Sequence, residues 1–290
     1  MEPARTSDPS FTFAFQPIVD AIAREVISYE ALIRGPGGES AYQILSQVPA
    51  ERLLAFDQKA RGKAIALAAR LGIECHLNLN FIPQSLRSGE SILSGLAAAD
   101  KAHIPAEHLV VEVTEGASIG DPAYFAELVN EHRGHGLKFA IDDFGAGYAG
   151  LNLLADFQPD LIKLDLKLVR DIERLGPRQA IVRGVAQVCF DLGIDVIAEG
   201  VETVGEYTWL AHAGIRLFQG FLFARPGFEC FPPVHYPGAD SVDLASARAR
   251  EASADSVHEA PMETGEFAAE PAPVAAASAH PILRPKHGIR

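Results

Sequence analysis

The chain has few cysteines, and they follow no pairing pattern. Its three cysteines are Cys75, Cys189 and Cys230, and no two of them are spaced as Cys-x-x-Cys. The sequence therefore favours neither a disulfide framework nor a zinc ribbon. Its 10 histidines form no His-x-His or His-Glu-x-x-His pattern, which leaves oxygen atoms as the available metal ligands. We expect a cytoplasmic protein whose metal ligands are oxygens.

Positive charge is also scarce. The chain has 25 Lys and Arg against 38 Asp and Glu, a formal net charge of −13. Because nucleic-acid backbones bind Lys and Arg rather than acids, this balance argues against a general nucleic-acid binder, and we expect no DNA partner. It is compatible with a small phosphate ligand that is bound through metal ions.

Long apolar runs are missing as well. No run approaches the roughly 18 residues that a membrane-spanning helix needs, and residues 1–10 are polar, with prolines and acids. We therefore expect no membrane segment and no export signal. With 48% hydrophobic and 22% charged residues, the composition is that of an ordinary globular protein.

The hydrophobic pattern alternates between short apolar runs and amphipathic stretches. The expected strands are residues 11–19, 25–34, 75–80, 109–114, 137–143, 161–165, 196–199 and 216–219. The expected helices are residues 41–48, 50–71, 92–99, 122–133, a short one near 151, 168–172, 179–192 and 203–213. About eight strands alternating with helices predict a closed parallel barrel, and the short link between the first two strands predicts an antiparallel hairpin.

The expected fold is thus α/β, a modified (β/α)8 TIM-type barrel with an antiparallel first strand, over residues 11–237. Residues 238–290 are rich in Ala, Pro, Ser and Glu and have few aromatic residues. Such a composition buries too little apolar surface to offset the entropy of ordering, so we expect a disordered C-terminal tail. The tail is either passive or a recruitment segment.

One stretch stands out among the strands. The apolar run that starts at Lys138 ends in Asp142 and Asp143, followed by a turn with Gly145 and Gly147. Two adjacent carboxylates repel each other unless a cation lies between them, so the pair indicates a metal site at the rim of the barrel. By itself the pair is equally compatible with turn chemistry and helix capping.

Most other strands also end in a polar residue, and in an α/β barrel these ends converge on one face. The residues are Glu30, Asn78, Glu112, Asp142, Asp143, Lys163, Glu199 and Gln219. Alternation along the second strand puts Leu32 and Arg34 on the face of Glu30, where Arg34 suits a phosphate. So many acids suit two hard divalent cations, Mg²⁺ or Mn²⁺, a device for hydrolysing phosphodiesters.

These residues lie in motifs that make the chain resemble the EAL-domain phosphodiesterases, which hydrolyse cyclic di-GMP. The motifs occur in the family's order over roughly residues 11–227: Gln16-Pro17-Ile18-Val19, Glu30-Ala31-Leu32-Ile33-Arg34, Asn78-Leu79-Asn80, Glu112-Val113-Thr114-Glu115, Asp142-Asp143-Phe144-Gly145-Ala146-Gly147-Tyr148, Lys163-Leu164-Asp165, Glu199-Gly200-Val201-Glu202 and Gln219-Gly220-Phe221. Family members often have Ser at the position of Asn80 and Thr at the position of Ala146, and neither departure removes a metal ligand.

The resemblance implies a role for each residue. One metal is expected on Glu30, Asn78, Glu112 and Asp142, and a second on Asp142, Asp143 and Glu199. Lys163 contacts the attacking water, and Gln219 supports the water and the metals. Gln16, Leu32 and Arg34 contact the substrate. The acids that support the loop after Asp143 are Glu115, Glu202 and Asp165.

The implied function is hydrolysis of cyclic di-GMP to linear pGpG, which lowers this second messenger in the bacterial signalling that regulates biofilms and motility. A homodimer and a regulatory partner protein are further expectations of the resemblance. The first alternative is a receptor module that binds cyclic di-GMP without cleaving it. The second is a barrel metalloenzyme of another kind, such as an enolase-like lyase. The paired aspartates together with Arg34 favour phosphate chemistry.

Overall fold

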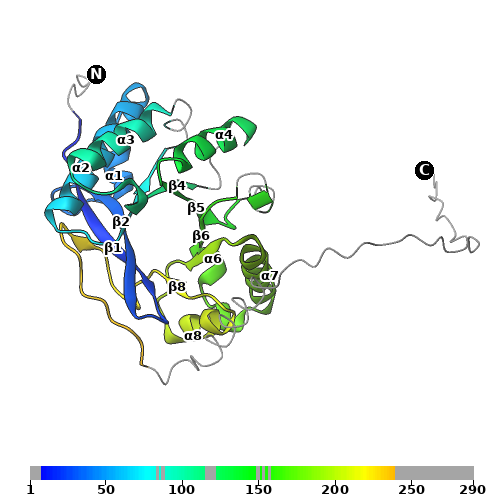
Figure 1. Ribbon diagram of the computed structural model, residues 1–290. Helices are drawn as coiled ribbons and strands as arrows, with labels where there is room; N and C mark the ends of the chain where they lie inside the picture. The colour runs from blue at the N-terminus through cyan, green and yellow to red at the C-terminus, as the bar shows by residue number, and fades with distance from the viewer. Residues whose placement is uncertain are drawn as a thin grey trace, which may run out of the picture. The chain divides into compact units, whose positions relative to one another are not determined.

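The computed structural model describes residues 8–82, 85, 89–114, 122–147, 151, 154–155 and 158–238. Within them eight strands form a closed barrel, β2-β3-β4-β5-β6-β7-β8-β1, in which β1 returns to pair with β2 (Figure 1). The expected α/β barrel is confirmed. The expected tail from residue 239 onward lies outside the described residues, and so do Glu115 and Tyr148.

The barrel begins with the predicted hairpin. Strands β1 (Thr12–Asp20) and β2 (Glu25–Arg34) are antiparallel, and Gln16 is paired with Glu30. Asp20 closes the turn, since its Oδ1 accepts hydrogen bonds from the backbone N–H of Ile22 at 2.8 Å and of Ala23 at 2.9 Å. The hairpin therefore brings its two polar residues side by side at one level of the barrel.

The remaining barrel strands are parallel to their neighbours from β2 to β8. They are β3 (His76–Asn80), β4 (Leu109–Thr114), β5 (Lys138–Phe144), β6 (Leu161–Leu164), β7 (Asp195–Ala198) and β8 (Leu217–Phe218). The antiparallel pairing of β8 with β1 closes the ring. A strand that the pattern did not predict, β9 (Gly227–Phe228), pairs with Ala14 and Phe15 of β1.

Helices connect the strands on the outside of the ring (Figure 1). They are α1 (Ala41–Leu45), α2 (Leu53–Arg70), α3 (Glu90–Lys101), α4 (Pro122–Arg133), α6 (Leu166–Val169), α7 (Gly176–Leu192) and α8 (Val204–His212). The 3-10 turns are Ala50–Arg52, Ala106–His108 and Ile172–Arg174. None of the helices in the described part of the chain is long and apolar enough to span a bilayer.

Helix ends agree with local sequence signals. Ser40 and Gln43 form a capping box at α1, and Thr203 and Glu206 form one at α8. Helix α7 ends at Gly193, whose φ of +70° is the left-handed conformation that glycine adopts without a steric penalty. The main apolar core lies between the strands and these helices and includes fully buried Phe15, Phe139 and Phe218.

Candidate active site

Along the barrel strands, the inward side chains change from apolar to polar. An inner layer contributed by strands all round the ring consists of Ile18, Val110, Ala140, Leu161, Ile197 and Leu217. Two positions away from these residues, and so on the same side of each strand, lie Gln16, Glu112, Asp142, Lys163, Glu199 and Gln219. The strand period places Gln16, Glu112, Asp142 and Lys163 next to this apolar layer, and Glu199 and Gln219 come directly after β7 and β8.

Lys163, on β6, is at the centre of the polar layer. Its side chain is 1% exposed, and its Nζ atom contacts four carboxylates. The distances are 2.7 Å to Glu199 Oε1, 3.0 Å to Glu112 Oε1, 3.1 Å to Asp142 Oδ1 and 3.2 Å to Glu30 Oε2. One ammonium group thus faces four acids, and a fifth, Asp143, lies beside Asp142 in the sequence. The cluster has a clear excess of negative charge.

Amide side chains orient two of these acids. Asn78 Nδ2 donates to Glu112 Oε1 at 2.8 Å, and Asn80 Nδ2 donates to Glu30 Oε1 at 2.9 Å. Gln219 Nε2 donates to the other oxygen of Glu30 at 2.8 Å. Glu30 is therefore held from both sides, and the role of Asn80 was not among the predicted ones. Its signal was present in the sequence, because Asn80 shares a strand face with Asn78.

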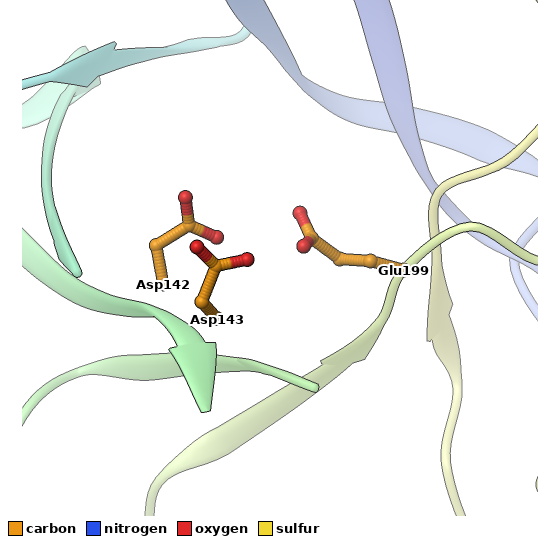
Figure 2. Close-up of side chains that lie close together, drawn as sticks. All are labelled: Asp142, Asp143 and Glu199. Atoms are coloured by element: carbon orange, nitrogen blue, oxygen red, sulfur yellow. The ribbon is translucent and has the colours of Figure 1, made fainter. Parts of the chain in front are cut away.

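The paired aspartates meet Glu199 at the rim. One oxygen from each of Asp142, Asp143 and Glu199 lies within 4.8 Å of the other two. Figure 2 shows the three carboxylates directed toward one another, with the aspartates at the end of β5 and Glu199 beyond the end of β7. Asp143 has a φ of +54°, a strained backbone conformation for a residue with a side chain. This turn lets two consecutive residues face the same space.

Burial and mutual repulsion shift the acids in the absence of metal. Burial is the main cause that raises the pKa of Glu112 to about 8, and the charges of Glu30 and Asp142 add to it, although Lys163 opposes the shift. Burial likewise raises the pKa of Glu199 well above its usual value, again against Lys163. The pKa of Asp143 is raised by burial and by Asp142. Without metal, the raised pKa values mean that protons bind to these acids and relieve their mutual repulsion. Bound cations would relieve the same repulsion.

Glu30 and Lys163 are shifted toward their charged forms. Burial favours neutral Glu30, but Lys163 and hydrogen bonds from Gln219 and Asn80 lower its pKa below the ordinary value. Burial also favours neutral Lys163, but the surrounding carboxylates, Asp142 and Glu112 foremost, raise its pKa well above the ordinary value. This pair is therefore the ionised part of the site.

The unused oxygens of the site fit divalent cations. Four buried side-chain oxygens accept no hydrogen bond among the described residues: Asn78 Oδ1, Glu112 Oε2, Gln219 Oε1 and Asp142 Oδ1, the last of which does have an ionic contact, to Lys163 Nζ at 3.1 Å. Buried polar atoms are normally satisfied, so a cluster of such orphans requires an explanation. Carboxylate and amide oxygens are the ligands that Mg²⁺ and Mn²⁺ prefer. Three of these four oxygens belong to residues that we predicted as metal ligands.

The predicted substrate residues line the same end of the hairpin. Arg34 is half-buried and donates from Nη1 to the carbonyl of Ile33 at 2.8 Å. Burial lowers its pKa, while Glu30 acts in the opposite direction. Gln16 is buried, and its Nε2 donates to the carbonyl of Ala224 at 3.1 Å, while its Oε1 accepts from Gln219 at 3.4 Å. Leu32 is partly exposed between Glu30 and Arg34 on the same strand.

Two of the acids that we predicted to support the loop after Asp143 are described, Asp165 and Glu202. Asp165 caps α6, accepting from Lys167 N at 2.8 Å, and its side chain also hydrogen-bonds with that of Asp143. Glu202 pairs with Arg170 at 2.9 Å. Asp165 is therefore in direct contact with a predicted metal ligand, and Glu202 pairs with an arginine that directly follows α6.

Sequence reasoning missed Glu206, a buried acid beside this region. It is 1% exposed and accepts from the backbone N–H groups of Glu202 at 2.9 Å, Thr203 at 3.0 Å and Asp171 at 3.1 Å. Glu206 thus holds the chain that follows Glu199. The capping-box spacing from Thr203 to Glu206 was the available signal.

Comparison with known proteins gives a family match. A family model described as the EAL domain matches residues 4–226. The Blue light- and temperature-regulated antirepressor BluF of Escherichia coli (strain K12) is 36% identical over 227 residues, which cover 78% of this chain and 56% of BluF. The cyclic di-GMP phosphodiesterase RocR of Pseudomonas aeruginosa is 34% identical over 158 residues, which cover 54% of this chain and 40% of RocR. The chain thus spans about half the length of these curated relatives.

Solved structures share the barrel. A standalone versatile EAL protein from Vibrio cholerae O395, in a c-di-GMP bound form, superposes with a TM-score of 0.76 at 43% identity, over 79% of this chain and 98% of that one. Klebsiella pneumoniae BlrP1, in a manganese and cyclic di-GMP complex, superposes with a TM-score of 0.73 at 43% identity, over 78% of this chain and 58% of that one.

Proposed function

The chain belongs to the EAL domain family, and from this premise we propose that it is a cyclic di-GMP phosphodiesterase that cleaves one phosphodiester bond and releases linear pGpG. The observation that carries the proposal is the buried cluster of Glu30, Glu112, Asp142 and Glu199 around Lys163, with four buried oxygens left without hydrogen-bond partners among the described residues. RocR, named a cyclic di-GMP phosphodiesterase, supports the same activity.

The proposal places two divalent cations, Mg²⁺ or Mn²⁺, in this cluster. Glu30, Asn78, Glu112 and Asp142 hold one, and Asp142, Asp143 and Glu199 hold the other. Bound there, the cations activate a water molecule and stabilise the charge that develops on the attacked phosphate. The manganese complex of BlrP1 with cyclic di-GMP supports this assignment.

The side chains of the protein then orient the reactants. Lys163 holds the attacking water by donating a hydrogen bond from its buried ammonium group. Arg34 provides a planar, doubly donating group for a phosphate oxygen. Gln219 keeps Glu30 in place, and Gln16 and Leu32 contact the nucleotide near Arg34. Asp165, Glu202 and Glu115 support the loop after Asp143.

The proposal also covers the setting of the enzyme. We propose that residues 11–237 form the catalytic unit, that the enzyme acts in the cytoplasm as a homodimer, and that a regulatory partner controls it. The three cysteines are free in the described structure, which agrees with a reducing compartment. The molecular mass in solution, measured by light scattering, tests the dimer.

A non-hydrolysing receptor is the second candidate. The observation that favours it is the 36% identity to BluF, which is named an antirepressor rather than a phosphodiesterase. A receptor that releases its ligand intact needs no cluster of five acids around a lysine. The cluster therefore favours hydrolysis.

The deciding experiment is chromatography of cyclic di-GMP after incubation with the protein and Mn²⁺ or Mg²⁺. We expect pGpG with the wild type, none with EDTA, and a loss of at least about 100-fold with Glu30→Gln. The matched control is Glu25→Gln, which changes an exposed acid of the same strand, far from the cluster, and should be fully active. Intact nucleotide that binds tightly would support the receptor instead, and no binding would exclude both.

A further inference from the structure

A buried ion pair lies outside the barrel, on helix α2. Arg61 and Asp57 are one helical turn apart and form a salt bridge between Arg61 Nη1 and Asp57 Oδ2, with side chains only 3% and 12% exposed. Neither residue belongs to the acid cluster or to the predicted substrate contacts. Two further nitrogens of Arg61, Nε and Nη2, have no hydrogen-bond partner among the described residues.

Both members of the pair contact the segment that follows β3. Asp57 Oδ2 also accepts a hydrogen bond from Ser85 Oγ, and the carboxylate accepts one from the backbone N–H of Ile82. The guanidinium of Arg61 lies over the ring of Phe81, with Cζ 3.9 Å from the ring centroid. Helix α2 thus holds Phe81, Ile82 and Ser85 through two hydrogen bonds and a cation–π contact.

This segment leads directly into the active site. Phe81 follows Asn80, whose side chain donates to Glu30, and Asn78 on the same strand donates to Glu112. The backbone N–H of Phe81 donates to the carbonyl of Glu112 at 3.0 Å. The position of Phe81 is therefore linked to two acids of the cluster by short hydrogen-bonded paths.

Stability does not account for the pair. Burial raises the pKa of Asp57 and lowers that of Arg61, so each charge is costly in this location. Buried ion pairs can often be replaced by well-packed apolar residues of similar size without loss of stability. What such residues cannot supply is the directional hold on Ile82, Ser85 and the ring of Phe81.

We propose that Asp57 and Arg61 are positioning residues that fix the end of β3, and through Asn78 and Asn80 the orientation of the Glu112 and Glu30 carboxylates toward a divalent cation. This inference rests on the cation site of the proposed function. According to this proposal, two residues of helix α2, on the outside of the barrel, strengthen cation binding inside it.

The test compares Asp57→Leu/Arg61→Met, which removes both the acceptor for Ile82 and Ser85 and the guanidinium over Phe81, with the wild type. We expect Mn²⁺ binding, measured by isothermal titration calorimetry, to weaken by about three- to tenfold, less than the roughly 10- to 100-fold loss typical of groups that contact a metal ligand directly, because Asp57 and Arg61 act one step further out. The melting temperature of the metal-free protein should stay nearly unchanged. Excess Mn²⁺ should restore hydrolysis, because the cation ligands themselves are intact.

The control is Asp20→Asn/Arg216→Met, which removes an ion pair at the opposite end of the barrel, where β1 meets the start of β8. It should bind Mn²⁺ as the wild type does. If the double variant of α2 fails to fold, Ser85→Ala removes the hydrogen bond to Asp57 and leaves the ion pair in place, and we expect it to weaken Mn²⁺ binding by about twofold or more.

The outcomes distinguish a failure of the positioning role from a failure of the proposed function. Wild-type Mn²⁺ affinity in both Asp57→Leu/Arg61→Met and Ser85→Ala would overturn the positioning role while leaving the proposed function standing. Weaker Mn²⁺ binding with an unchanged melting temperature supports it. A wild-type protein that binds no Mn²⁺ would remove the cation site, and with it both proposals.

Discussion

At the scale of the residue, Lys163 has the most unusual surroundings in the described molecule. Its buried ammonium group contacts four carboxylates within 3.2 Å. In the metal-free protein it is the positive charge that offsets their mutual repulsion. A divalent cation bound here, as we propose, would offer the same compensation with twice the charge and would stabilise the same acids as Lys163.

This arrangement predicts the behaviour of Lys163→Met. Removing one partner of a buried ion pair costs about 3 kcal/mol or more, so the metal-free variant should melt well below the wild type. Mn²⁺ should raise its melting temperature by more than it raises that of the wild type, because a repelling charge is gone. Hydrolysis should fall at least about 100-fold.

Thermal unfolding with EDTA and with Mn²⁺ measures the first two effects. Lys138→Met, which changes a half-buried lysine at the start of β5, is the control and should respond to Mn²⁺ as the wild type does. A Lys163→Met protein with the same Mn²⁺-induced shift as the wild type would contradict the shared role.

Glu112 makes the stability of the metal-free protein depend on pH. Its pKa is about 8 in the folded protein and 4.5 ordinarily, so folding favours the protonated acid. The stability from this group is fully present below about pH 4.5 and is lost as the pH rises toward 8. Glu199 and Asp143 are shifted in the same direction.

We therefore expect the melting temperature in EDTA to fall between pH 5 and pH 8. Glu112→Gln, which imitates the protonated acid, should have a flatter profile and a higher melting temperature at pH 8. Thermal unfolding at four pH values checks both. Parallel profiles for the variant and the wild type would show that Glu112 is not the titrating group.

At the scale of the element, helix α6 supports two rim loops. A Cβ atom added to Gly145 would overlap Leu168, and one added to Gly200 would overlap Leu166, both leucines of α6. Gly145 lies two residues after Asp143, and Gly200 follows Glu199 directly. One short helix thus packs against both loops that present Asp143 and Glu199.

Gly200→Ala tests this packing. The backbone at Gly200 has a φ of +63°, so alanine costs about 1 kcal/mol in backbone strain. Its methyl group would also overlap Leu166, so either the Leu166 side chain moves or the backbone at residue 200 moves and shifts the neighbouring Glu199. We expect hydrolysis and Mn²⁺ affinity to fall several-fold. The control is Gly193→Ala at the end of α7, where φ is +70° and nothing lies within 4 Å of an added Cβ.

Both variants should lose similar stability, and only Gly200→Ala should lose Mn²⁺ affinity. Calorimetric titration at matched temperature distinguishes them. Equal Mn²⁺ affinity in the two variants would contradict a link from α6 to the site.

The main strands were predictable because their side chains alternate. The period of two places Glu112, Asp142 and Lys163 inward, and all expected barrel strands are present within about two residues of their expected ends. Strand β9 was missed because a two-residue strand has no period to detect. Its existence depends on pairing with distant β1.

The missed residues share a different cause. Charged Asp57 and Arg61 on a helix would be expected to face solvent, and their burial follows from how α2 packs on the segment after β3. Likewise, Glu206 has a local signal as a cap, but its contact with Asp171 comes from the tertiary fold. Sequence patterns give the direction of a side chain, whereas contacts between distant segments require the structure.

At the scale of the whole molecule, the barrel includes more chain than the family match. The match ends at residue 226, but the following segment packs on the hairpin. The rings of Phe231 and Tyr29 are stacked 4.2 Å apart, and β9 pairs with β1. Residues that follow the family match therefore pack against the β1–β2 hairpin.

Truncation tests the extent of the folded unit. A chain that ends after Gly238 should hydrolyse cyclic di-GMP and melt like the full chain. A chain that ends after Pro226 loses β9 and the Phe231 stack, which should cost about 2 to 4 kcal/mol. Differential scanning calorimetry of both chains checks this, and equal melting temperatures would contradict the covering role of residues 227–238.

The central claim is that the buried acids around Lys163 hold two divalent cations for phosphodiester hydrolysis. Anomalous diffraction at the manganese edge, from crystals grown with Mn²⁺, tests it most directly. We expect two peaks about 4 Å apart, both next to Asp142, with Glu30 and Glu112 beside one and Asp143 and Glu199 beside the other. A cluster without peaks, in crystals that contain saturating Mn²⁺, would contradict it.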